Sequence, residues 1–129
     1  MLRIAQLISI LFVGVLSTAA IAAIFFPGSV GAASGFNPTS DYGLTNIRTL
    51  GAPLLMMAVV TAVAAYSRKW LFLLPATLYF LFNGLTRVIS LFNEQYDEVM
   101  LRGLFLTFGL FLLATWVLKM FYQAEKSTA

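Results

Sequence analysis

Three arginines are the residues whose type and position most suggest chemistry in this sequence. Arg48, Arg87 and Arg102 each lie at or inside the end of a long apolar segment. An ionised arginine costs roughly 2.5–3.5 kcal/mol at the centre of a membrane-spanning helix, and less near an end, where its long side chain can reach the interface. Arg87 lies deepest, more than one turn inside its segment. Its side chain should therefore point toward other helices and away from lipid.

Polar residues accompany Arg87 at helical spacing. Tyr79, Asn83 and Ser90 recur with it at intervals of three or four residues, which places all four on one face of a helix. A set of this kind inside an apolar segment marks a candidate functional face, because intramembrane polar groups turn away from lipid.

Two main interpretations of the arginines stay open. In the first, the carboxylates expected on the same side of the membrane, which include Asp41 and Glu94, neutralise the arginines in an ion-pair network. In the second, the guanidinium groups form a pocket for an anionic or polar head group, which they can grip in a forked geometry. A proton or ion path is less favoured, because no acidic residue lies deep in an apolar segment.

The sequence contains no histidine and no cysteine. Their absence removes thiol nucleophiles, thiolate metal sites, histidine-ligated haem and a Ser-His-Asp triad. We therefore predict no catalytic residues, no metal site, no cofactor and no enzymatic activity. Basic residues are scattered singly except for Arg68 and Lys69, so the net charge of +3 does not indicate a nucleic-acid partner.

The elements that position these residues should be membrane helices. Apolar residues make up 60% of the 129 residues and charged residues 10%, against about 45–50% and about 25% in soluble domains. Four apolar stretches, at about 4–26, 47–66, 70–92 and 99–122, can each cross a hydrocarbon core about 30 Å thick, which takes about 20 helical residues. None alternates in polarity as a barrel strand does. We expect an all-α fold, an integral membrane antiparallel four-helix bundle, formed by a single domain of residues 1–129.

The connections between these stretches differ in length. Residues 27–46 are rich in Gly, Ser, Ala, Asn and Pro, and we expect a long outer loop there. The other connections are a cationic turn at 67–69 and an acidic turn at 93–98. Residues 4–26 could also form a secretory signal peptide, but the apolar run is longer than a usual signal core, which favours a retained first helix.

Lysine and arginine predict the orientation of the chain in the membrane. With the N-terminus inside, the inner side holds five basic residues, and the outer loops hold four carboxylates; the basic residues are Arg3, Arg68, Lys69, Lys119 and Lys126, and the carboxylates are Asp41, Glu94, Asp97 and Glu98. This distribution follows the positive-inside rule and predicts that both termini are cytoplasmic.

Small and aromatic residues predict how the helices pack. Five glycines are expected to permit close helix approach: Gly14, Gly51, Gly84, Gly103 and Gly109. On the first helix, Gln6, Ser9, Val13 and Ser17 share a face, which is typical of interhelical packing and hydrogen bonding. The phenylalanine-rich fourth helix offers a large apolar surface. Lipid is its simplest contact, and a partner protein, pigment or quinone is the alternative.

Two short segments carry a family resemblance. In Asn46–Gly51 an arginine followed closely by glycine opens the second helix, and in Leu85–Ser90 a second arginine lies late in the third. Together with the length and four spans, they resemble small bacterial inner-membrane proteins of the DoxX-like group, in a branch known only as a domain of unknown function. The resemblance implies a four-helix bundle in a bacterial cytoplasmic membrane and no established activity. That branch often carries an acidic residue in its last helix, whereas Leu104–Leu118 has none here.

The sequence favours a non-enzymatic role. We expect an accessory or structural subunit of a larger membrane complex, in contact with the lipid bilayer and with other membrane subunits or copies of itself. The alternative is a binder or carrier of a lipophilic molecule, such as a lipid, quinone or pigment, whose anionic or polar head meets the outer arginines.

Overall fold

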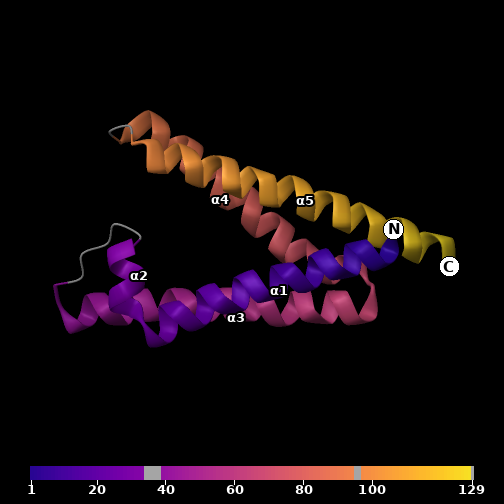
Figure 1. The fold of residues 1–129 in the computed structure, drawn as a ribbon, viewed down its shortest axis with the longest axis horizontal. Helices are drawn as coiled ribbons and strands as arrows, with labels where there is room; N and C mark the ends of the chain where they lie inside the picture. Colours follow the sequence, from indigo (N-terminus) through magenta and orange to yellow (C-terminus); the bar gives the residue numbers. More distant parts are fainter. Residues whose placement is uncertain (34–38, 95–96, 129) are drawn as a thin grey trace.

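The described part of the chain is all-α, as the sequence predicts (Figure 1). The computed structural model describes residues 1–33, 39–94 and 97–128. Its elements in chain order are α1 (Leu2–Phe25), α2 (Pro27–Ala33), α3 (Asp41–Ser67), the 3-10 turn η1 (Trp70–Leu73), α4 (Leu74–Asn93) and α5 (Glu98–Thr128).

Four helical stretches are long and apolar enough to cross a membrane. They are Leu2–Phe25, Asp41–Ser67, Trp70–Asn93 and Glu98–Ser127, and each corresponds to one of the predicted spans. The third opens with η1, and Pro75 then lies in the first turn of α4, where its missing N–H costs no helical hydrogen bond. The fourth is longer than predicted, because α5 continues past Tyr122 to Thr128. The chain is therefore consistent with a multi-pass membrane protein.

The predicted loop at 27–46 is wrong at both ends. Pro27 opens the short helix α2, a position that suits its fixed backbone angle. At the other end, Ser40 caps α3: its Oγ accepts a hydrogen bond from the Gly43 N–H at 3.1 Å, and Asp41 complements the helix dipole in the first turn. As a result Arg48 lies about two turns inside α3, not in its first turn. The rest of the predicted loop, 34–38, lies outside the described residues.

The predicted acidic turn at 93–98 is also shorter than expected. Asn93 is the last residue of α4 and Glu98 the first of α5. Residues 95 and 96 of this turn lie outside the described residues. The cationic turn at 67–69 is confirmed, since α3 ends at Ser67 and η1 begins at Trp70.

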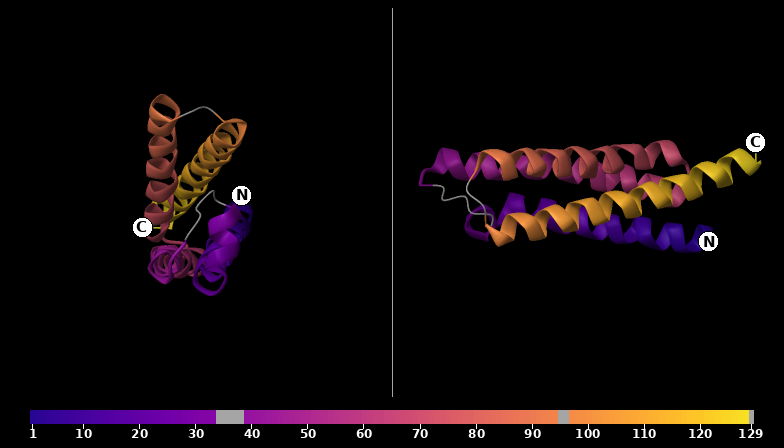
Figure 2. Two further views of the ribbon diagram at one scale, coloured as in Figure 1. Left: turned by 90° about the vertical axis from the view of Figure 1, so that its left-hand side faces the viewer. Right: turned by 90° about the horizontal axis from the view of Figure 1, so that it is seen from above.

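The long helices form two pairs, α1 with α3 and α4 with α5 (Figures 1 and 2). Both termini and the turn from α3 into η1 lie at one end, which we call the terminal end. The opposite end, which carries α2 and the connection from α4 to α5, we call the loop end. The pairs meet at the terminal end and diverge toward the loop end (Figure 1).

The core is concentrated where the two pairs meet. At the terminal end, buried residues from both pairs pack together: Ala5, Ala64, Leu73, Val117 and Phe121. One step toward the loop end, Phe12 of α1 packs against Phe80 of α4, with their ring centroids 5.5 Å apart, and Ala114 of α5 completes the cluster. Tyr79 is half-buried beside this cluster, so the polar residues that follow it on α4 lie beyond the shared core.

Three of the five glycines allow close contact. A Cβ at Gly51 would lie 2.8 Å from the Ala20 carbonyl oxygen of α1, and a Cβ at Gly84 would lie 3.1 Å from the Phe108 ring of α5. Gly103 faces the Arg87 side chain. The prediction is wrong for two others, Gly14 and Gly109, whose Cβ would meet nothing within 4 Å because both face outward.

Candidate functional site

A ladder of hydrogen bonds runs along α4 from Tyr79 to Arg87. The Asn83 Nδ2 donates to the Tyr79 Oη at 3.3 Å, and the Arg87 Nε donates to the Asn83 Oδ1 at 3.0 Å. Each step spans four residues, so one turn of helix separates each side chain from the next. The shared polar face that the sequence predicts is therefore confirmed for these three residues, and it holds the Arg87 guanidinium from one side.

Gly103 of α5 provides the space for the Arg87 guanidinium. A Cβ built on Gly103 would lie closer to the Arg87 Nη1 than real atoms approach. The guanidinium therefore rests directly against the α5 backbone, in space that any other residue would fill. The Gly103 carbonyl oxygen accepts a hydrogen bond from the Thr107 Oγ1 at 2.7 Å, which leaves it partly occupied.

Arg87 lies at the border of two hollows. One, of about 420 Å³, follows the polar face of α4 and is lined by Tyr79, Asn83 and Arg87 together with Ser90. The other, of about 680 Å³, lies at the loop end. Its lining brings Arg87 together with Arg102 and Asp97, and with residues 32–33 at the end of α2. We call the second hollow the loop-end hollow.

Of the two arginines at the loop-end hollow, Arg87 has a neutral hydrogen-bond partner, Asn83. Within the described ranges, no ion pair joins Arg87 or Arg102 to a carboxylate. Asp97 lines the hollow, but its Oδ1 accepts a hydrogen bond from the Val99 N–H at 3.1 Å and so caps α5. The arrangement thus favours the pocket interpretation over the ion-pair network.

Arg48 performs a different task from the other two arginines. Its Nη1 donates to the Ile24 carbonyl oxygen at 2.5 Å. Ile24 lies in the last turn of α1, whose carbonyl groups have no partner within the helix and carry the negative end of its dipole. Arg48 therefore caps α1 from α3, and it is not among the residues that line the two hollows.

The seven residues predicted from the sequence divide into two groups. Tyr79, Asn83 and Arg87 form the ladder, and Arg102 shares the loop-end hollow with Arg87. The other three are not brought to that hollow: Arg48 caps α1, Asp41 is exposed in the first turn of α3, and Glu94 is exposed after α4.

Two residues that line the loop-end hollow, Asp97 and Gly103, were not predicted from the sequence as site residues. Asp97 belongs to the lining, and the sequence signal that could have identified it is its position just before α5, where a capping carboxylate is favoured. Gly103 was predicted only to permit helix approach. Its role depends on which face of α5 meets α4, for which the sequence gives no signal.

The donors at the loop-end hollow are of the kind that bind anions. The Nε of Arg87 is used by Asn83, so its terminal nitrogens, together with Arg102, are the donors that border the hollow. Guanidinium groups bind phosphate and carboxylate by paired charge-assisted hydrogen bonds. The described residues also contain no group of three or more carboxylates that could hold a metal ion.

No family model matches the chain, and no curated protein or solved structure matches it significantly. The resemblance to the DoxX-like group therefore stays a prediction, and the function has to be argued from the site.

Proposed function

We propose that this protein is a multi-pass membrane protein that binds an amphiphilic molecule with an anionic head group at the loop end. Four helices of sufficient length and apolarity support the membrane placement. In this proposal they form an antiparallel transmembrane bundle in a bacterial cytoplasmic membrane. The positive-inside rule puts the terminal end, with Arg3, Arg68 and Lys69, in the cytoplasm, and the loop-end hollow then faces the outer leaflet.

One observation carries the proposal: the Arg87 guanidinium is held by Asn83 and Gly103 at the border of a hollow that it shares with Arg102. A positive charge inside a membrane is costly unless a counter-charge or water accompanies it. Since no described carboxylate pairs with Arg87, a phosphate or carboxylate head group would supply the counter-charge. The apolar tail would lie along the apolar faces of α4 and α5, where Phe82 and Leu106 line the two hollows.

Native mass spectrometry tests this function. The protein is purified gently from its own membrane, and the mass retained beyond the polypeptide is compared between the parent and Arg87→Ala. We expect the variant to lose most of the bound amphiphile. Arg48→Ala is the matched control, because it removes a guanidinium that does not line the hollows, and it should keep the parent's occupancy. Equal occupancy in the parent and Arg87→Ala would refute the proposal.

A second candidate is the accessory or structural subunit of a larger membrane complex. The supporting observation is the apolar area that the fold leaves uncovered. In each candidate spanning helix, only between 22% and 33% of the 18-residue apolar stretch is buried within the protein. On α5, the side chains of Phe105 and Leu112 are 68% and 67% exposed. Lipid or a partner subunit can cover such faces. Mass measurement after gentle purification separates the two, since a subunit would carry a stoichiometric partner.

A further inference from the structure

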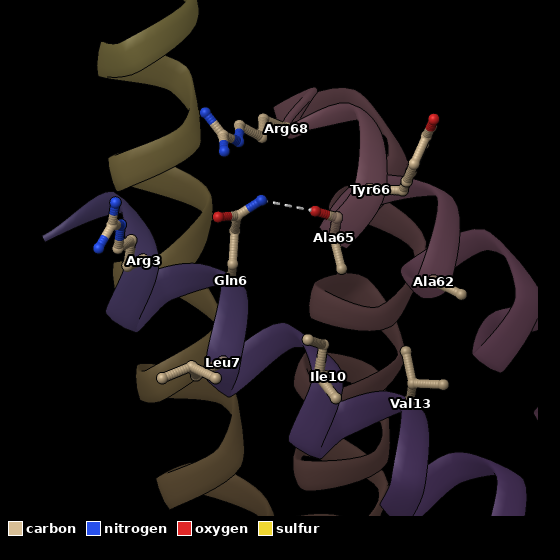
Figure 3. Close-up of a pocket in the computed structure, with 9 residues that line it drawn as sticks. All are labelled: Arg3, Gln6, Leu7, Ile10, Val13, Ala62, Ala65, Tyr66 and Arg68. Carbon is tan, nitrogen blue, oxygen red and sulfur yellow. Dashed lines mark hydrogen bonds between the residues drawn. The ribbon is translucent and has the colours of Figure 1, made fainter.

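A separate groove lies between α1 and α3 at the terminal end (Figure 3). It has a volume of about 760 Å³, and its apolar part is formed by Leu7, Ile10 and Val13 of α1 with Ala62 of α3. Leu7 and Ile10 are 65% and 57% exposed, so this part of the groove is open along the side of the helix pair.

The mouth of the groove is polar and positively charged. Arg3 of α1 and Arg68, which follows α3, flank the Gln6 side chain (Figure 3). The Gln6 Nε2 donates to the Ala65 carbonyl oxygen at 3.0 Å, which satisfies one of the carbonyl groups left free in the last turn of α3. This hydrogen bond joins the two helices and uses neither of the two guanidinium groups at the mouth.

The electrostatics of the mouth favour an anion. No carboxylate lines the groove, and within the described ranges neither Arg3 nor Arg68 forms an ion pair. Four of the five acidic residues of the chain lie at the loop end, and the fifth, Glu125 near the end of α5, is not among the residues that line the groove. Tyr66 completes the mouth and is 92% exposed, as is typical of an aromatic side chain at a membrane interface.

The backbone holds Arg68 in an unusual conformation. It is the residue that ends α3, with φ 58° and ψ 26°, in the left-handed region that glycine normally occupies at this position. A side chain here destabilises the backbone relative to glycine. The chain nevertheless has arginine here, and this position brings its guanidinium to the mouth of the groove.

We propose that this groove binds one anionic phospholipid of the inner leaflet, with its phosphate between Arg3 and Arg68 and one acyl chain along the apolar part. From Arg3 to Val13 a helix rises about 15 Å, at about 1.5 Å per residue, which is half of a hydrocarbon core about 30 Å thick. The groove thus has the depth of one leaflet, and basic pockets between helices on the cytoplasmic side suit anionic head groups. The inference rests on the membrane orientation proposed above but not on the loop-end hollow.

The experiment compares retention of two lipids with identical acyl chains, phosphatidylglycerol and phosphatidylcholine, by native mass spectrometry of the purified full chain. It is carried out in an Arg87→Gln, Arg102→Gln background, so that the loop-end hollow does not contribute. Loss of amphiphile binding at the loop end and loss of lipid binding at this groove are then distinguishable.

Three variants define the site. Arg3→Gln and Arg68→Gly should each weaken phosphatidylglycerol binding about tenfold, the effect of losing a charge-assisted hydrogen bond, with phosphatidylcholine unchanged. Arg68→Gly also relieves the left-handed backbone, so it should unfold no earlier than the parent, which excludes misfolding as the cause. Ala62→Phe fills the apolar part from an exposed position and should abolish retention while both arginines remain.

Lys69→Ala is the matched control, because it removes one positive charge from the same turn without touching the groove. It should change phosphatidylglycerol binding by less than about twofold, since surface charges act weakly. Three results would each overturn the proposal: equal binding of the two lipids by the background protein, a Lys69→Ala loss as large as that of Arg68→Gly, or full retention by Ala62→Phe.

Discussion

Replacing Gly51 by alanine should separate α1 from α3. The added Cβ would lie 2.6 Å from the Ile24 Cγ1 and 2.8 Å from the Ala20 carbonyl oxygen, whereas ordinary contacts begin at 3.4 Å. The Ile24 side chain is β-branched and stiff at χ1, so its Cγ1 has little freedom to move, and the carbonyl oxygen belongs to the backbone of α1. That helix must therefore move by about 0.6 Å at Ala20 to accept the methyl group.

The magnitude follows from comparison with Gly14→Ala. Overfilling a packed interface costs about 1–3 kcal/mol. Both substitutions gain about 1 kcal/mol of helix propensity, but a Cβ at Gly14 meets nothing within 4 Å. The propensity gain cancels in the comparison, so Gly51→Ala should be about 1–3 kcal/mol less stable than Gly14→Ala.

Equilibrium unfolding in mixed detergent micelles measures this difference. Trp70 packs edge-on against Tyr122, with ring centroids 5.5 Å apart, and lies against the core at the terminal end. Trp116 packs against the same core, so the fluorescence of the two tryptophans together should report loss of tertiary structure. Gly51→Ala should unfold at a lower fraction of denaturing detergent than Gly14→Ala. Identical unfolding curves for the two variants would refute the close approach of α1 and α3 described above.

Three further predictions follow from the site and the fold. Gly103→Ala should lower the free energy of unfolding by less than about 1 kcal/mol, because only the end of the flexible Arg87 side chain has to move. It should nevertheless weaken amphiphile binding as strongly as Arg87→Ala in native mass spectrometry. Unchanged binding would contradict the placement of the Arg87 guanidinium against Gly103. Arg48→Gln should lower the free energy of unfolding by about 1 kcal/mol through loss of the α1 cap, with ligand occupancy unaffected. Because the chain has no native cysteine, single Ser29→Cys and Ser127→Cys variants can be labelled with a membrane-impermeant maleimide in spheroplasts: the first should react and the second should not, and the reverse result would invert the orientation.

The four spans could be predicted because the bilayer imposes the same demand on every spanning helix. About 20 consecutive apolar residues are needed whatever the helix packs against. The ladder from Tyr79 to Arg87 could be predicted for a related reason. Once a segment is helical, residues four apart lie on one face without any information about its neighbours.

Features that depend on contacts between helices could not be predicted. Gly14 and Gly51 both lie inside predicted helices, but only Gly51 faces another helix. The role of Gly103 depends on the rotation of α5 against α4, and that of Arg48 on where α1 ends. The helical turns inside 27–46 were missed because their Gly, Ser and Asn content is typical of loops, while the start of α3 depends on a single cap at Ser40.

The measurement that tests the central claim most directly is fluorescence quenching beside Arg87. A Phe82→Trp substitution places a reporter in the hollow that Arg87 also lines, away from the native Trp70 and Trp116 at the terminal end. A brominated fatty acid and the brominated alcohol of equal chain length are then titrated into the protein, with and without Arg87→Gln. We predict that the acid quenches at about tenfold lower concentration than the alcohol, and that Arg87→Gln removes this difference. Equal quenching by the acid and the alcohol while Arg87 is present would contradict anion binding at this site.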